Sequence, residues 1–168
     1  MKTCTSSVVL PCSPERFWQI YLDDAFLRAL YLDALQYKAF SIIEGGTESK
    51  KLHIVPKLNL PGPIAKLMGD SFAYEQHGRL DRAKSLWTWQ MLPPAAHASK
   101  KQLVSTHGSI RIEAAGDGRC RRHDEVVIDA KVFGLGGMIE AAAEKETLAA
   151  QAKEVALIEQ WAAKSHAA

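Results

Sequence analysis

The hydrophobic pattern at the start of the chain predicts one strand followed by two short helices. Residues 3–10 are rich in β-branched side chains and stop at a proline, as a strand does. The Ser-Pro pair at 13–14 is typical of a helix N-cap with proline at the first helical position, so we expect a helix over 14–22. A second helix is expected after the Asp-Asp pair at 23–24, because apolar residues then recur at spacings of three and four. These residues are Phe26, Leu27, Leu30, Tyr31 and Leu35.

From residue 36 onward the pattern changes to short apolar segments separated by turn residues, which predicts six further strands. A Gly-Asp-Gly sequence at 116–118 indicates a hairpin between the last two, since glycine accepts the positive φ of tight turns. Residues 59–69 predict a loop with one or two helical turns. The expected strands span 37–44, 51–55, 72–80, 86–92, 103–112 and 119–133.

The segment from Gly137 to about Lys164 predicts a long helix, because it is rich in alanine and contains no further glycine or proline. At 1.5 Å per residue it would be roughly 40 Å long, enough to cross a curved sheet. A periodicity of 3.6 residues predicts that one face of this helix is apolar. That face consists of Met138, Ala141, Leu148, Ala149, Ala152, Val155 and Ala156.

This order of elements resembles the helix-grip architecture of START-like domains, a superfamily that includes lipid-transfer proteins and polyketide cyclases. Three local sequences add to the resemblance, at 10–18 (LPCSPERFW), 60–69 (LPGPIAKLMG) and 133–140 (FGLGGMIE), and they are similar to an uncharacterised family within it. The resemblance implies an α+β fold in which a curved, antiparallel, seven-stranded sheet wraps around the long C-terminal helix. It further implies a single domain over residues 1–168, with a hydrophobic cavity that holds a lipid-like ligand.

The strand expected at 86–92 indicates where such a ligand would bind. Trp87, Trp89 and Met91 alternate with polar residues and therefore point to one face. Aromatic rings and a flexible thioether suit the wall of an apolar pocket, although the same residues could equally fill a solid core. Further candidate ligand-binding residues, on other strands and on the long helix, are Phe40, Ile42, Ile54, Phe72, Tyr74, Val104, Ile110, Leu148 and Ala152.

Strand alternation also places polar residues on the predicted apolar wall, namely Gln76, Thr106, Arg122 and Asp124. Arg122 and Asp124 are two residues apart and could pair in the cavity, where they would orient a ligand hydroxyl or carboxylate. Alternatively, the pair lies at a solvated end of its strand. By the same alternation, the histidines at 77 and 107 are expected to face away from the wall.

Composition and missing motifs narrow the function classes. With 47% hydrophobic and 24% charged residues and a net charge of +2, the chain is typical of a globular protein and is not expected to bind nucleic acid. Its three cysteines lack C-x-x-C spacing, so we expect neither disulfides nor a zinc site, and a cytoplasmic location. No metal, cofactor or catalytic residue is predicted. The glycines at 134–137 are interpreted as a sharp turn before the helix, with a phosphate loop the weaker alternative.

The first functional hypothesis is therefore a non-enzymatic binder or transporter of a lipid, sterol-like or polyketide-like molecule. The second is a cyclase, dehydratase or hydrolase acting in the same cavity, which requires a buried ionisable group beside the apolar wall, with Asp124 or Arg122 as the first candidates. The third is a protein-interaction module that uses the C-terminal helix. Ligand exchange would require movement of residues 60–69 or 134–137. Stable membrane insertion is not expected, because no apolar stretch approaches about 20 residues. Transient membrane contact and the oligomeric state stay open.

Overall fold

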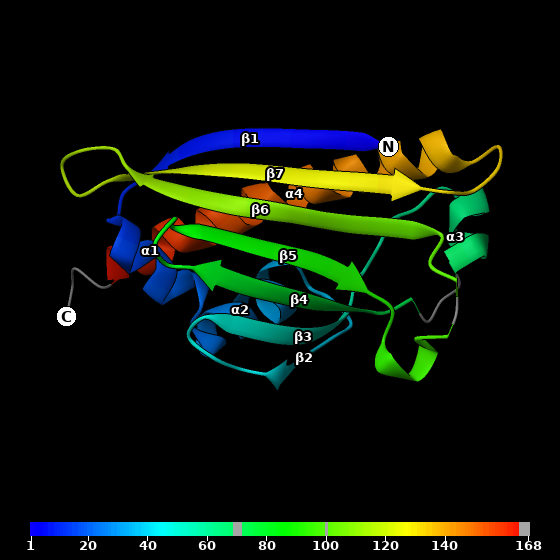
Figure 1. The fold of residues 1–168 in the computed structure, drawn as a ribbon, viewed down its shortest axis with the longest axis horizontal. Coiled ribbons are helices and arrows are strands. Elements are labelled where there is room, and N and C mark those ends of the chain that lie inside the picture. Colours follow the sequence, from blue (N-terminus) through cyan, green and yellow to red (C-terminus); the bar gives the residue numbers. More distant parts are fainter. Residues whose placement is uncertain (69–71, 100, 165–168) are drawn as a thin grey trace.

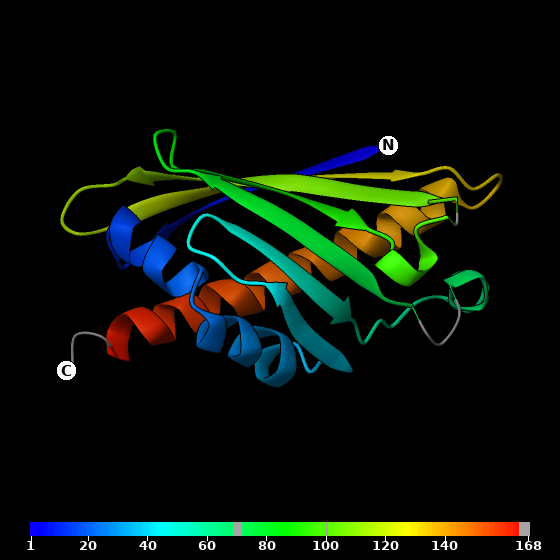
Figure 2. The ribbon, with the colours of Figure 1, turned by 60° about the horizontal axis from the view of Figure 1, so that its bottom comes forward.

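A computed structural model describes residues 1–68, 72–99 and 101–164. They form an antiparallel sheet whose concave face is crossed by one long helix, as Figures 1 and 2 show. The strands are β1 (Lys2–Leu10), β2 (Ala39–Glu44), β3 (Ser49–Val55), β4 (Tyr74–Asp81), β5 (Leu86–Leu92), β6 (Val104–Ala114) and β7 (Cys120–Ala130). The helices are α1 (Pro14–Tyr21), α2 (Asp24–Arg28), the π-helix η1 (Ala29–Ala34), α3 (Gly62–Met68), the 3-10 turn η2 (Ala95–His97) and α4 (Gly136–Lys164).

The seven strands of the described residues are ordered β1-β7-β6-β5-β4-β3-β2. Each strand from β2 to β6 pairs with the next one along the chain, whereas β1 pairs with β7, so that Leu10 lies opposite Cys120. The hairpin predicted at 116–118 joins β6 to β7, and all three of its residues have positive φ. The predicted order of strands along the chain is thus confirmed, with strand ends that differ from prediction by a few residues.

The two helices predicted near the N-terminus form as their caps indicate. The Ser13 hydroxyl accepts a hydrogen bond from the backbone N–H of Arg16 at 3.2 Å, and Asp23 accepts bonds from the first turn of α2. After α2 the chain continues as η1, a π-helix that buries Leu30 and Tyr31. Figure 2 shows α1, α2 and η1 beside the C-terminal half of α4, so they fill one part of the concave face.

Most of the apolar face predicted for the long helix is wrong, although Val155 packs against the core. Leu148 and Met138 are exposed by 45% and 47%, and Ala152 also lies on the solvent side. The buried residues are instead Ile139, Ile158 and Ala162. Alanines occur all around α4, so their spacing does not distinguish its faces, and the side toward the sheet carries polar residues.

The chain turns sharply between β7 and α4. The strand predicted to reach residue 133 ends at Ala130, and Phe133 is fully exposed. Gly134 has a φ of +73°, and a Cβ on Gly136 would lie 2.7 Å from the carbonyl oxygen of Ala130. These glycines therefore permit a tight turn and a close approach. Within the described parts of the chain, no helix is long and apolar enough to cross a bilayer.

Candidate functional site

A cavity of about 210 Å³ lies between the concave face of the sheet and α4. It occupies the part of that face that α1, α2 and η1 leave uncovered. Residues 56–68, including α3, form a further wall, and Ile64 of α3 is fully buried against it. Residue 69, at the end of the predicted segment 60–69, lies outside the described residues. Most of the lining is apolar, and several polar side chains are interspersed with it.

Eight of the predicted ligand-binding residues line this cavity, and six lie elsewhere. Leu148 and Ala152 lie on the solvent side of α4, so their predicted position at the cavity is wrong. Phe40, Ile42, Ile54 and Trp87 belong to the core or pack against it, because α1, α2 and η1 cover that part of the sheet. The eight at the cavity are Phe72, Tyr74, Trp89, Met91, Val104, Ile110, Arg122 and Asp124.

The two tryptophans of β5 occupy different environments although they share a face. Trp87 is 2% exposed and packs edge-on against Tyr21 in the core, whereas Trp89 borders the cavity. Each indole lies over a glycine of a neighbouring strand. A Cβ on Gly78 would be 2.0 Å from the ring of Trp87, and one on Gly108 would be 2.8 Å from that of Trp89. These close approaches position both rings.

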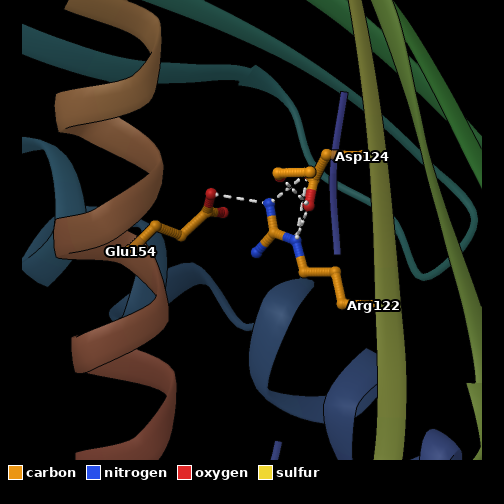
Figure 3. Close-up of polar contacts among 4 residues, drawn as sticks. Arg122, Asp124 and Glu154 are labelled. Atoms are coloured by element: carbon orange, nitrogen blue, oxygen red, sulfur yellow. Dashed lines mark hydrogen bonds and ion pairs between the residues drawn. The ribbon is translucent and has the colours of Figure 1, made fainter. Parts of the chain in front are cut away.

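Arg122, Asp124 and Glu154 form a buried ionic cluster (Figure 3), and all three residues line the cavity. The guanidinium of Arg122 donates to Asp124 through Nε (2.8 Å to Oδ2) and through Nη2 (2.7 Å to Oδ1). Nη2 also donates to Oε2 of Glu154 on α4 at 2.9 Å. The cluster therefore connects β7 to the long helix across the cavity wall.

The members of the cluster differ in accessibility. The Arg122 side chain is 1% exposed, that of Asp124 is 5% and that of Glu154 is 13%. The Arg122 guanidinium carbon lies 5.8 Å from the ring centroid of Phe17 and 5.9 Å from that of Tyr21, which cover it from α1. The alternative prediction, that Arg122 and Asp124 lie at a solvated strand end, is wrong.

The net effect of burial and neighbouring charges is to raise the pKa of two members of this cluster, Glu154 and Arg122. Burial raises the pKa of Glu154, and the neighbouring Asp124 charge adds to this, while the positive charge of Arg122 partly offsets it. Burial would lower the pKa of Arg122, but the charges of Glu154 and Asp124 outweigh it and raise that pKa. Arg122 is therefore always charged, whereas Glu154 holds a proton more readily than an exposed glutamate.

Four tyrosines border the cavity, and three of them were not predicted as site residues. Burial raises the pKa of Tyr21, Tyr31 and Tyr74 well above the ordinary value and that of Tyr37 to about 12. All four phenols thus remain protonated near neutral pH and can donate hydrogen bonds. The predicted polar residues Gln76 and Thr106 also line the cavity, as strand alternation indicated.

Glu154 was missed because it lies outside the apolar face that the sequence predicts for the long helix. One signal was available: Glu154 precedes the buried Ile158 by four residues and therefore shares its helix face. The histidines at 77 and 107 lie outside the cavity, with His77 bonded to Glu75 at 2.8 Å and His107 exposed. No group of three or more potential metal ligands occurs among the residues that the structure describes.

Several solved structures are similar to this chain over nearly its whole length. An aromatase/cyclase from Streptomyces sp. R1128 has a TM-score of 0.68 at 13% identity, covering 95% of this chain and 94% of that one. A Thermus thermophilus protein has a TM-score of 0.65 at 12% identity, covering 94% and 97%. Norcoclaurine synthase from Thalictrum flavum has a TM-score of 0.64 at 18% identity, covering 95% and 85%. These similarities confirm the predicted helix-grip, START-like fold.

The sequence was also compared with family models and with curated proteins. A family model described as "Protein of unknown function (DUF2505)" matches residues 5–162. No curated protein matches this chain significantly. The matched region includes every strand pair and the whole ionic cluster, apart from the first residues of β1.

Proposed function

The chain belongs to the DUF2505 family, and from its cavity we propose that it binds a hydrophobic small molecule between the sheet and α4. The observation that supports this most strongly is the free space of about 210 Å³, with mostly apolar walls that include a buried ionic cluster. A well-packed core of this size would contain few voids larger than a water molecule. A space of this volume therefore fits a site better than it fits a packing defect.

Both parts of the cavity contribute to binding. Apolar ligand surface removed from water contributes about 25 cal/mol per Å², which makes affinity depend on how much of the ligand the walls of the cavity cover. The ionic cluster fixes the orientation, because a ligand whose polar group lies away from it would leave that group without a charged partner and incur a desolvation penalty. We propose that Trp89, Met91 and Tyr74 contact the apolar body and that the ionic cluster lies near its polar end.

Native mass spectrometry with a panel of fatty alcohols, sterols and aromatic amines tests this proposal. We expect at least one ligand to form a one-to-one complex with the folded chain. The variant Ala150→Phe should abolish the complex, because Ala150 lines the cavity and a phenyl ring would fill it. Ala149→Phe is the matched control, since the neighbouring Ala149 faces solvent. The proposal fails if no ligand binds, or if Ala150→Phe binds as well as the wild type.

The buried carboxyl of Glu154 favours a second candidate, a cyclase, dehydratase or hydrolase in the same cavity. A carboxyl group with a raised pKa can act as a general acid, and the Arg122 guanidinium beside it would stabilise the carboxylate that remains. Conversion of a β-hydroxy ketone, followed by liquid chromatography and mass spectrometry, is a suitable assay. Loss of conversion in Glu154→Gln would support this candidate. Unchanged conversion there and in the double variant Arg122→Ala/Asp124→Ala would contradict it.

A cytoplasmic location and ligand exchange through α3 complete the proposal. The three cysteines are free and buried, as suits a reducing compartment. The segment 56–68 forms a cavity wall without belonging to the sheet, so it could move without breaking strand pairs. Hydrogen exchange of α3 amides should slow when a ligand is bound, and an unchanged exchange rate would argue against α3 as the gate.

A further inference from the structure

The charges around the cavity are unequal. Among the described residues that line it, one side chain is a cation, Arg122, and three are carboxylic acids, Asp124, Glu146 and Glu154. Arg122 makes a two-nitrogen contact with Asp124 and shares only Nη2 with Glu154. Arg122 therefore pairs mainly with Asp124, and its charge compensates that of Glu154 less completely. A buried carboxylate in this position gains from a second cation.

The accessible member of the cluster is the carboxylate and not the guanidinium. Arg122 is 1% exposed, and its Nη1 is enclosed without a hydrogen-bond partner among the described residues. Glu154 accepts through Oε2, while Oε1 takes no hydrogen bond from the described part of the chain, and its side chain is 13% exposed. A ligand in the cavity therefore meets the acceptor oxygens of Glu154 before it meets the donors of Arg122.

The aromatic lining of the cavity also favours a cationic ligand over an anionic one. Tyr21, Tyr31, Tyr74 and Trp89 all border the free space, and the faces of such rings carry partial negative charge that attracts cations. A ligand carboxylate would instead meet three acidic side chains, with the one guanidinium enclosed by Phe17 and Tyr21. Charge, accessibility and aromatic lining thus favour a cationic polar end and disfavour an anionic one.

We propose that the cavity selects amphiphilic amines, with the ammonium group of the ligand paired to Glu154 and its apolar body against Trp89. This inference rests on the proposed binding function and names its ligand class. An apolar cavity of about 150 Å³ holds a benzene molecule, so one of about 210 Å³ suits an aromatic body of one or two rings. Primary alkyl amines resemble lysine, whose pKa is about 10.4, and are charged at neutral pH.

Three ligands with the same naphthyl ring and a two-carbon side chain test the inference. They are 2-(1-naphthyl)ethylamine, 2-(1-naphthyl)ethanol and the carboxylate 1-naphthaleneacetate. Titration calorimetry at pH 7 should give the amine an affinity about tenfold above that of the alcohol, because a charge-assisted bond replaces a neutral one. The acetate should bind most weakly. Equal affinities for amine and alcohol, or tighter binding of the acetate, would overturn the inference while leaving the binding function intact. Binding of none of the three would instead count against the binding function itself.

Substitution of the proposed partner sharpens the test. Glu154→Gln should lower the ratio of amine affinity to alcohol affinity about tenfold, since glutamine keeps the shape and loses the charge. Glu159→Gln is the matched control, because Glu159 is exposed on the same helix and its loss changes the net charge equally. Retained alcohol binding shows that the variant is folded. If Glu154→Gln and Glu159→Gln have the same effect on amine affinity, the ammonium group does not pair with Glu154.

Discussion

Replacement of Arg122 by methionine should destabilise the protein strongly through the carboxylates that it leaves behind. In the wild type Asp124 and Glu154 both accept hydrogen bonds from the guanidinium, and the two side chains are only 5% and 13% exposed. Methionine approximates the length of the arginine stem and keeps contact with the aromatic rings of α1. The main change is therefore the loss of a buried cation between two buried acids.

Removing one partner of a buried ion pair costs about 3–5 kcal/mol, because the remaining charge is unpaired in a medium of low polarity. We expect Arg122→Met to fall in this range, with part of the cost relieved by protonation of Glu154, whose pKa burial already raises. For a chain of this size, about 2–4 °C per kcal/mol corresponds to a melting temperature lower by roughly 6–20 °C. Adding Asp124→Asn and Glu154→Gln should restore part of the stability by removing the unpaired charges.

Urea unfolding followed by circular dichroism measures these differences. The matched control is Arg121→Met, because Arg121 is adjacent, exposed and on the opposite face of β7. It should change the free energy of unfolding by less than about 0.5 kcal/mol. If Arg122→Met and Arg121→Met unfold at the same urea concentration, the cluster contributes no net pairing energy and the reasoning fails.

Three further variants test other parts of the structure. Gly78→Ala should lower the free energy of unfolding by about 1–3 kcal/mol, measured by thermal melting, because its Cβ would overlap the ring of Trp87. The control Gly62→Ala should be tolerated, because a Cβ there would have no atom within 4 Å. Similar melting temperatures for the two variants would contradict the overlap. Glu154→Gln tests the raised pKa of Glu154: relative to this variant, the unfolding free energy of the wild type should fall as pH rises above 4.5 through that pKa, and a constant difference would refute it. Ser13→Ala removes the α1 cap and should cost about 1 kcal/mol in urea unfolding, a loss that Ser13→Thr should largely avoid.

The sheet could be predicted from sequence because its information is local. Each strand alternates its side chains with a period of two, so one correct position assigns the rest of that strand. This reasoning placed Trp89 and Asp124 on the concave face, as the structure confirms. It did not distinguish Trp87 from Trp89, because helices from another part of the chain cover only one of them.

The long helix was predicted in extent but not in orientation. Its apolar residues are mostly alanines, and burial of an alanine contributes little, so packing against larger residues decides which side faces inward. The side of α4 that faces the cavity carries polar as well as apolar residues. Glu154 and Thr147 therefore lie where a solid core would have large aliphatic side chains. The ionic cluster therefore depends on an arrangement between α4 and β7 that no local pattern encodes.

The pairing of β1 with β7 has a consequence for how the molecule folds. Leu10 and Cys120 are adjacent in the sheet, but almost the whole sheet is synthesised between them. Contacts so distant in sequence form slowly, because the intervening chain must lose its freedom before they are made. During synthesis β2 to β6 can pair in turn, while the apolar residues of β1 stay unpaired until β7 and α4 have been made. Because α4 is the last element to be synthesised, the cavity cannot be enclosed before the rest of the sheet exists. Under the proposed binding function, a ligand present at that stage would be enclosed without any gate opening.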